Sequence, residues 1–515
     1  MKPTPSEPLL RLLLFTPLLL GTSVASAVAQ TPAAPAAAQA PAPPAVAQAP
    51  AGPKPITIGD VVFSTAIRSR TYSWNWFGNS PAGDYTYQGS QWRFGLSQSK
   101  KPYDWQLEFE VPFMVNLPTT AVAAAPQGQL GLGGSYFAAN NNGRNPAALF
   151  LKQGFIRFKG LGGIAGQSLK IGRMEFNDGL EVTPKSATLA ALNRDRISQR
   201  VLGNFGFSDV LRSLDGAQYV LSTPTLNLTA VAARPTEGVF QVNGWNELNI
   251  NVFYGALTGQ AGSERNPAAW RVFALGYDDY RHGVLKTDNR PAAARAADAE
   301  SIAIGTYGGN YLQVAATPAG PVDLLFWGVL QAGSWGTLAH RAGAFAAEVG
   351  WQPAALPALK PWIRAGYDYS SGDSHPTDDK HGTFFQALPT PRIYARMPFF
   401  NLMNNVDAFG ELILRPSSRL TMRTDVHALS LADKNDLWYA GGGAFQPGTF
   451  GFAGRPSNGH TGLATLYDFS GDITLNAHVA LNLYYAYAHS RAVSQAIFPT
   501  SNGAHLGFAE WQIRF

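Results

Sequence analysis

The sequence contains no cysteine, only 14% charged residues and, beyond its N-terminal stretch, no apolar run of about 18 residues. The lack of cysteine means that no disulfide framework can be drawn. The lack of long apolar runs excludes helical membrane spans. The net charge of +5 does not imply a nucleic-acid role. Glycine (53 residues) and aromatics (12%) are abundant, which suits short strands and turns better than helical bundles.

Residues 1–29 are predicted to be a signal peptide. Lys2 and Arg11 flank the apolar run "LLLFTPLLL" at 12–20, which is too short to cross a bilayer as a helix. Small residues follow it in overlapping A-x-A patterns, and we place cleavage after Ala29, with Ala27 as the alternative. The other interpretation of this stretch is a short membrane anchor.

Residues 30–55, "QTPAAPAAAQAPAPPAVAQAPAGPKP", have no periodicity and almost no charge, so they are predicted to form a semi-extended linker. Such a linker serves either as a spacer or as a tether in the periplasm.

From residue 56 to residue 515 the sequence alternates between apolar and polar side chains. In "WQLEFEVPF" (105–113) the aromatic and aliphatic residues fall on one face of an extended chain, and Gln106, Glu108 and Glu110 on the other. The final stretch "FAEWQIRF" (508–515) follows the same rule. A soluble sandwich also alternates, but many of these strands are ten or more residues long, and aromatics cluster near strand ends. Both features are typical of membrane strands.

The pattern predicts an all-β fold: a transmembrane antiparallel β-barrel of about 18 strands, of the outer-membrane type. Expected strands start near residues 84, 167, 405 and 473, among others. Expected connections alternate between short ones, such as "TPT" (223–225) and "SGD" (470–472), and long ones, such as 177–212 and 373–404. The connection near 259–267 fits this alternation poorly.

Short periplasmic turns then place both termini in the periplasm of a Gram-negative-type bacterium. The last strand must pair with the first, because an open edge in lipid leaves backbone groups unpaired. The terminal Phe515 resembles the signal read by the barrel-assembly machinery.

If the apolar face meets lipid, the other face lines the lumen. Its charges either pair across the lumen and brace the wall, or leave arginines free to attract an anionic solute, since the guanidinium binds carboxylates with two parallel hydrogen bonds. The inward acids include Glu108, Glu110, Glu348, Asp368, Glu411, Asp425 and Glu510, and the inward cations include Arg68, Arg70, Arg93, Lys170, Arg364, Arg415 and Arg423.

Three stretches resemble the alginate export porin family. They are "SLKIGRMEFNDG" (168–179), "RSLDGAQY" (212–219) and, as the most specific match, "GYDYSSGDSHPTDDKHGTFFQALPTPRIYARM" (366–397). The resemblance implies an eighteen-stranded barrel with an arginine-rich constriction through which anionic polysaccharide leaves the cell. Carried over by motif, the candidate lumen residues are Arg173, Asp178, Arg212, Asp215 and Arg364.

Side-chain parity disagrees with the family motif at two of these positions. Arg173 shares a face with Leu169 and Ile171, and Asp215 shares one with Tyr219. Either a bulge at Gly172 turns Arg173 inward, or both residues lie above the membrane band. Arg364 satisfies both arguments and is the strongest single candidate.

Two loop segments have open alternatives. "TLAALNRDRISQR" (188–200) looks helical, and it either folds into the pore as a constriction or caps the wall. "SSGDSHPTDDKHG" (370–382) is acidic enough to bind Ca²⁺ but lacks EF-hand spacing, and is otherwise a solvated loop.

The predicted function is a monomeric outer-membrane channel that passively conducts an anionic polysaccharide or oligosaccharide without a cofactor. This function is compatible with a periplasmic export partner that feeds the pore. A general or solute-specific uptake porin of the same fold is the first alternative. An outer-membrane lipid hydrolase is the alternative from another class. His427 lies on a strand, but no serine partner in a recognisable motif accompanies it.

Overall fold

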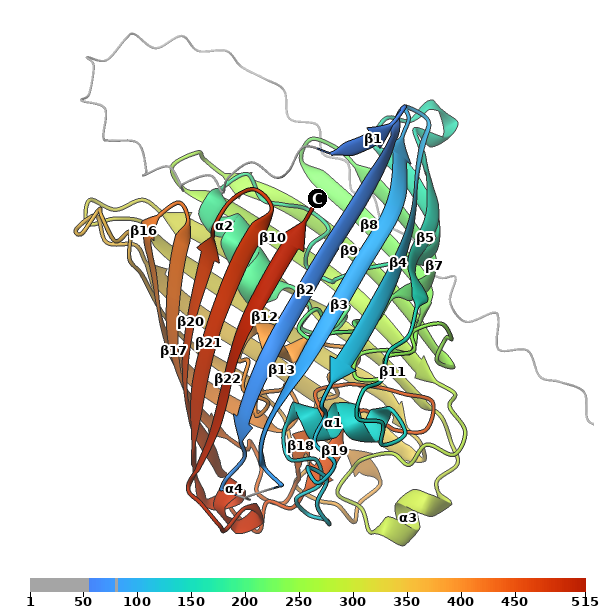
Figure 1. Cartoon of the computed structure of the whole chain (residues 1–515), viewed down its shortest axis with the longest axis vertical. Coiled ribbons are helices and arrows are strands. Elements are labelled where there is room, and N and C mark those ends of the chain that lie inside the picture. The colour runs from blue at the N-terminus through green and yellow to red at the C-terminus, as the bar shows by residue number, and fades with distance from the viewer. Residues whose placement is uncertain (1–54, 79–81) are drawn as a thin grey trace, which may run out of the picture. The chain divides into compact units, whose positions relative to one another are not determined.

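The strands pair in sequence order into one closed antiparallel sheet (Figure 1). The computed structural model describes residues 55–78 and 82–515, so the predicted signal peptide and nearly all of the linker lie outside the described residues. The sheet holds twenty strands, and eighteen of them form the barrel wall, which confirms the predicted fold. None of the described helices is long and apolar enough to span a bilayer.

The wall strands are β2 (Val61–Asn75), β3 (Asp84–Ser99), β4 (Tyr103–Val115), β5 (Phe150–Lys159), β6 (Gln167–Met174), β7 (Leu214–Ser222), β8 (Leu226–Pro235), β9 (Ile250–Gly262), β10 (Pro267–Asp279), β11 (Ile302–Ala315), β12 (Val322–Trp335), β13 (Leu338–Trp351), β14 (Trp362–Ser370), β16 (Asn405–Ser417), β17 (Leu420–Ser430), β20 (Gly462–Thr474), β21 (Val479–Ser490) and β22 (Gly503–Arg514).

Smaller elements complete the structure. The short strands are β1 (Ile56–Ile58), β15 (Lys380–His381), β18 (Trp438–Ala440) and β19 (Ala453–Arg455). The α-helices are α1 (Leu132–Ala139), α2 (Ala187–Leu192), α3 (Ala292–Ala297) and α4 (Ala492–Ile497). Single helical turns lie at η1 (Leu161–Gly163), η2 (Asn193–Ile197, a π-helix) and η3 (Pro391–Ile393).

The first and last wall strands close the barrel. β2 pairs with β22 from Ala66 opposite Arg514 to Asn75 opposite His505, and the backbones of Thr65 and Phe515 exchange two further hydrogen bonds. Arg70 and Glu510 stand directly opposite each other in this seam and form an ion pair on its inner face. The C-terminal strand is therefore paired on both edges, with β21 and β2. Its strict alternation is explained because one face, with Glu510, is buried toward the lumen and the other, with Trp511, is exposed on the outside.

The short connections gather at one rim, together with β1 and the C-terminus, and the long ones at the other, with α1, α3 and α4 (Figure 1). Several boundaries differ from the sequence expectation. The stretch "SGD" lies inside β20, and the real connection is 475–478. The doubtful connection near 259–267 shrinks to 263–266, because β9 continues to Gly262. β12 and β13 are joined by only residues 336–337, so one connection at the long rim is short.

The outer face of the wall is apolar, and the inner face carries the charges. Because side chains alternate along a strand, every second residue contacts the outside. Large exposed apolar side chains recur there, including Trp92, Leu107, Phe253, Phe326, Leu330, Tyr485 and Trp511.

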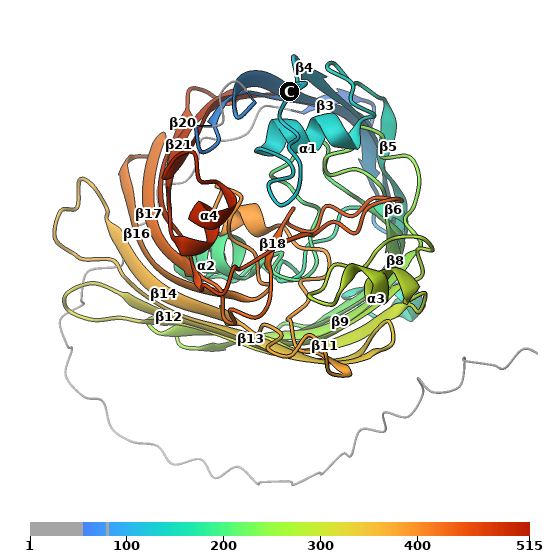
Figure 2. The same cartoon turned by 90° about the horizontal axis from the view of Figure 1, so that it is seen from below.

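Aromatic side chains from distant connections pack together inside the long rim. Trp76 stacks on Phe399 with ring centroids 5.4 Å apart, Phe399 stacks on Trp438 at 5.2 Å, and Phe77 stacks on Phe498 at 4.7 Å. Seen along the barrel from this rim, α1, α4 and β18 lie within the ring of strands (Figure 2).

We expect a charge on the outer face to destabilise the barrel in a depth-dependent way. Leu330, in the middle of β12, is 71% exposed, and Leu356, in a short connection, is 62% exposed. Leu330→Arg should lower the free energy of unfolding from lipid vesicles by about 2–4 kcal/mol, and Leu356→Arg by at most about 1 kcal/mol. Equal losses in a denaturant titration would show that Leu330 does not face hydrocarbon.

Candidate functional site

The connection between β6 and β7, residues 175–213, folds into the lumen, and we name it the first inserted loop. α2 and η2 belong to it, and Figure 2 shows α2 inside the ring of strands. Of the two alternatives for the 188–200 segment, the structure therefore places it within the pore and not on the wall.

Local sequence explains how this loop becomes helical. Ser186 caps α2 by accepting a hydrogen bond from the backbone N–H of Leu189 (3.5 Å). Leu189 and Leu192 are buried, and the helix then widens into the π-helical turn η2. This turn directs Arg196 toward the wall and leaves the Arg194 side chain 63% exposed. π-helical turns are frequent at functional sites.

A buried charge cluster fastens this turn to β13 and β14, and we name its five residues the central network: Arg196, Arg200, Glu348, Arg364 and Asp368. The Arg196 Nε lies 3.0 Å from both carboxylate oxygens of Glu348. Arg200 donates to the Asp368 Oδ1 (2.6 Å), and the Arg364 Nη2 donates to the Glu348 Oε2 (2.7 Å). Arg364 thus stands in the lumen wall, but it is paired and only 3% exposed.

The network holds more cations than carboxylates, and its surroundings supply the balance. Asp323 and Glu411 lie 3.8 Å and 4.0 Å from the Arg364 guanidinium. The Arg196 guanidinium lies 4.2 Å from the ring centroid of Phe409, so its face is also covered by an aromatic π-system. Buried charges are costly unless paired and hydrogen-bonded, so we infer that the network fixes the position of the loop more than it adds stability.

The far end of the first inserted loop is held by the seam. Arg68 donates to the backbone oxygens of Gly206 (2.8 Å) and Ser208, and Arg70 donates to that of Phe207. Asp209 lies 3.7 Å from Arg68. The loop therefore crosses the lumen from β13 and β14 to β2 and β22.

Asp178 anchors the near end of the same loop. Its Oδ1 accepts the backbone N–H of Leu202 (3.0 Å), and its Oδ2 accepts from both terminal nitrogens of Arg271 on β10 (3.3 Å each). Burial raises the pKa of the Asp178 carboxyl to about 6, although Arg271 acts to lower it. Sequence reasoning found Asp178 but missed Arg271, which shares the inward parity of β10.

The connection between β14 and β16, residues 371–404, also folds inward and docks on the first; we name it the second inserted loop. Leu202 and Leu388 form a parallel bridge, the Gln386 amide donates to the Arg200 backbone oxygen (2.7 Å), and the Tyr394 hydroxyl donates to that of Ser198 (2.6 Å). The two inserted loops thus contact each other directly, and the contacts of the second loop lie within 366–397, the stretch most similar to the alginate export family.

Arg212 joins these loops without a carboxylate. Its Nη2 donates to the backbone oxygen of Pro389 (2.9 Å) and its Nη1 to that of Gly443 (3.1 Å). Burial lowers the pKa of the Arg212 guanidinium to about 9.

Arg173 and Asp215 face outward, contrary to their assignment as lumen residues. The β5–β6 and β6–β7 ladders run without a register shift, so no bulge at Gly172 turns Arg173 inward. The two side chains pair with each other at 2.6 Å, and Arg173 also donates to the backbone oxygens of Gly244 and Trp245 in a long connection. The pair lies at the end of β6 and the start of β7, beside the long connection 175–213.

The remaining candidate lumen cations fall into two groups, those that form an ion pair with a carboxylate and those that do not. Arg93 pairs with Glu108 (2.8 Å), and Arg423 pairs with Glu411 (3.0 Å) and Asp195 (3.4 Å). In the described part of the chain, Lys170 and Arg415 form no ion pair: the Lys170 Nζ lies 4.7 Å from the Phe155 ring centroid, and the Arg415 guanidinium lies 5.4 Å from that of Trp362.

Sequence reasoning missed two further lumen cations because they stand on loops, where strand parity gives no direction. One is Arg194 of η2, paired with Asp195. The other is Arg396 of the second inserted loop, which donates to the Asn482 amide oxygen (3.2 Å). We name the set Lys170, Arg194, Arg396, Arg415 and Arg423 the basic vestibule.

Two alternative site chemistries find little support. Among the described residues, the ligating side chains of 370–382 do not come together as a metal group, and His381 is instead stacked on Trp335 and bonded to His340 (2.9 Å). His427 faces the lumen and donates to Asp407, while its Nε2 meets no serine hydroxyl within the residues described. The arrangement is not that of a hydrolase triad.

A family model described as "Alginate export" matches residues 134–490. The chain belongs to the alginate export family. This family match covers both inserted loops and most wall strands. No curated protein matches the chain.

Solved structures with the same architecture are outer-membrane porins. The chain is similar to OpdK of Pseudomonas aeruginosa, solved with vanillate, at 10% identity and a TM-score of 0.51, covering 88% of this chain and 98% of that one. A BenF-like porin from Pseudomonas fluorescens Pf-5 matches at 7% identity and a TM-score of 0.54, covering 89% and 100%. At this identity the likeness concerns the fold. Together with the family, it supports an outer-membrane channel.

Breaking the central network should free the first inserted loop. Arg200→Ala removes the nearest cation from buried Asp368 and one of the three arginines that pair with Glu348, at a cost of about 3–5 kcal/mol. We expect larger and noisier single-channel currents in planar bilayers. Lys185→Ala, which removes an exposed lysine on the same loop outside the charged lumen sites, is the matched control, and its loss should cost about 0–1 kcal/mol at most. Identical currents in both variants would mean that the network does not hold the loop.

Docking of the first inserted loop should depend on pH through Asp178. Its pKa of about 6 in the docked loop exceeds the ordinary value of about 4 that it regains when released. The docked loop therefore binds the proton more tightly, and this contribution to docking is complete below pH about 4 and lost as the pH rises through about 6. We expect fewer opening events at pH 5 than at pH 7, and no such difference in Asp178→Asn.

Proposed function

We propose that this channel conducts an anionic polysaccharide or oligosaccharide outward across the outer membrane. The observation that carries the proposal is the basic vestibule, in which Lys170 and Arg415 have no carboxylate partner among the described residues. A lumen cation that is not neutralised by the wall is available to a carboxylate of the solute. Membership of the alginate export family supports a uronate polymer as that solute.

The position of the vestibule supports export. Lys170 stands next to the short connection 160–166, and Arg415 next to the short connection 418–419. Short connections are periplasmic in outer-membrane barrels, and we propose the same side for the C-terminus. A polyanion arriving from the periplasm would then meet Lys170 and Arg415 near the entrance to the lumen.

We further infer that the inserted loops form the constriction and that they must move for a polymer to pass. The first inserted loop crosses the lumen between buried ion pairs. These contacts fix its position more firmly than the contacts of an exposed surface loop would. The barrel is proposed to act as a monomer in outer-membrane lipid. It is assembled through its C-terminal strand with Phe515 and fed from the periplasm without a cofactor.

A channel for small carboxylates is the second candidate function. The crossing of the lumen by the first inserted loop favours it, because a narrow constriction suits a small solute better than a chain.

The test is single-channel recording in planar bilayers with defined sidedness. We expect polyuronate to reduce the current from the short-connection side, while neutral glucan does not. The double variant Lys170→Glu with Arg415→Glu should invert the preference for anions over cations and abolish the reduction. Lys100→Glu is the control, because the exposed Lys100 side chain pairs with Asp60 outside the lumen.

Each outcome separates the two candidates. Reduction of the current by a small aromatic carboxylate but not by polyuronate favours the uptake channel. A non-selective pore that neither solute affects, and that the double variant leaves unchanged, would contradict both.

A further inference from the structure

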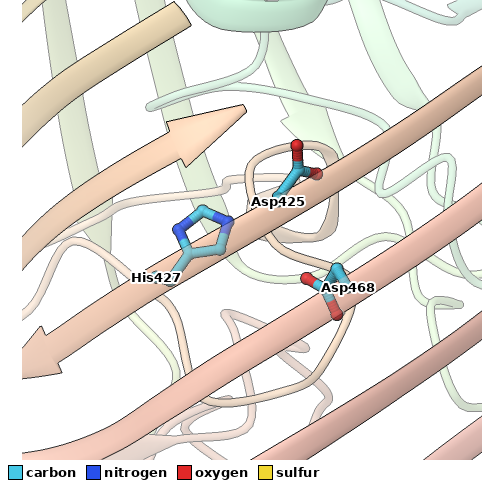
Figure 3. Close-up of side chains that lie close together, drawn as sticks. All are labelled: Asp425, His427 and Asp468. Carbon is cyan, nitrogen blue, oxygen red and sulfur yellow. The ribbon is translucent and has the colours of Figure 1, made fainter. Parts of the chain in front are cut away.

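Three ligating side chains converge on the inner face of two neighbouring wall strands. Asp425 and His427 lie on β17, and Asp468 lies on β20 directly opposite Asp425 in the ladder. Residues two apart on a strand share a face, so His427 stands beside the pair. One ligand atom from each residue lies within 4.8 Å of the others, and Figure 3 shows the three side chains grouped across the two strands.

The imidazole of His427 is held in an orientation that leaves one nitrogen free. Its Nδ1 is 2.7 Å from the Asp407 Oδ2, so the ring N–H at this position donates to a carboxylate. The Nε2 atom is buried without a hydrogen-bond partner in the described part of the molecule, and the residue is 1% exposed. A histidine that binds a metal through one nitrogen characteristically donates the other N–H to a carboxylate in this way.

The carboxylates also have supporting contacts. The Tyr484 hydroxyl donates to the Asp468 Oδ1 (2.6 Å), which orients that group. The Asp425 Oδ1 has no hydrogen-bond partner among the described residues.

The nearest cations are engaged elsewhere. Arg423 pairs with Glu411 and Asp195, Arg392 donates to backbone oxygens of its own loop, and Arg396 donates to Asn482. Two carboxylates that stand opposite each other in a ladder repel, and neither Asp425 nor Asp468 forms an ion pair within the described residues. A bound divalent cation would remove this repulsion.

We propose that Asp425, His427 and Asp468 bind a divalent transition-metal ion. The donor set of two carboxylates and one imidazole suits Zn²⁺, Mn²⁺ or Co²⁺, whereas Ca²⁺ and Mg²⁺ prefer oxygen alone. Asp425 is half-buried toward the lumen, so water can complete the coordination. The ion would join β17 to β20 by bonds additional to the backbone ladder. This proposal does not depend on what the channel conducts.

The experiment uses the full-length barrel in detergent, stripped of metal with a chelator and titrated with Zn²⁺ in a calorimeter. We expect one equivalent to bind to the wild type. His427→Gln and Asp468→Asn should weaken binding at least about 100-fold, and Asp407→Asn, which removes only the orienting carboxylate, about 10- to 100-fold. Asp472→Asn is the matched control, because it removes another carboxylate from β20 on the same face and should leave binding unchanged.

Equal Zn²⁺ binding by the wild type, His427→Gln and Asp468→Asn, or no saturable binding at all, would overturn the proposal. His427 would then be a protonated imidazolium that neutralises the surrounding acids. A measurement on the wild type alone covers the case in which a variant fails to fold. Mn²⁺ added to the stripped barrel should show coupling to an imidazole nitrogen in pulsed electron paramagnetic resonance, and its absence would equally overturn the proposal.

Discussion

The hydrogen-bond ladder between β2 and β22 is the constraint on which the remaining structure depends. In hydrocarbon no water can satisfy a free backbone N–H or C=O, so the sheet has to end where it begins. Once it is closed, the period of two along each strand divides the side chains between lipid and lumen. The apolar set then faces outward, and charges such as Glu348, Arg364 and Asp368 are confined to one enclosed space.

That confinement explains why the inserted loops carry so much charge. A wall carboxylate in a narrow lumen loses part of its hydration and needs a partner. Glu348 and Asp368 obtain theirs from Arg196 and Arg200 of the first inserted loop, and Arg68 and Arg70 find carbonyl oxygens at its other end. We therefore propose that bracing and attraction, the two alternatives for the lumen charges, fall to different residues. The middle of the lumen is braced, and the unpaired cations stand near the short rim.

The wall could be predicted from the sequence and its contents could not. Alternation is a local property, so strand starts at 84, 167 and 405 agree with the structure, and the face of Arg364 follows directly. The prediction that Arg173 faces the lumen was wrong, because a family motif gives a position in the chain but not the side of the wall to which the side chain points. The partners of the loop residues are non-local. Arg200 and Asp368 are 168 residues apart, Arg196 and Glu348 are 152 apart, and Asp178 and Arg271 are 93 apart. Each pair forms only because a long connection passes that part of the wall. No period in the sequence encodes that path.

The Arg70–Glu510 pair connects residues 440 positions apart, and the same arginine also holds the first inserted loop at Phe207. Contacts of such separation carry a large loop-closure entropy and form late in folding. The interior of this barrel can thus reach its final arrangement only after the C-terminal strand has arrived. Assembly of the wall and setting of the constriction are therefore one event, and a barrel whose seam has not closed also lacks a settled pore.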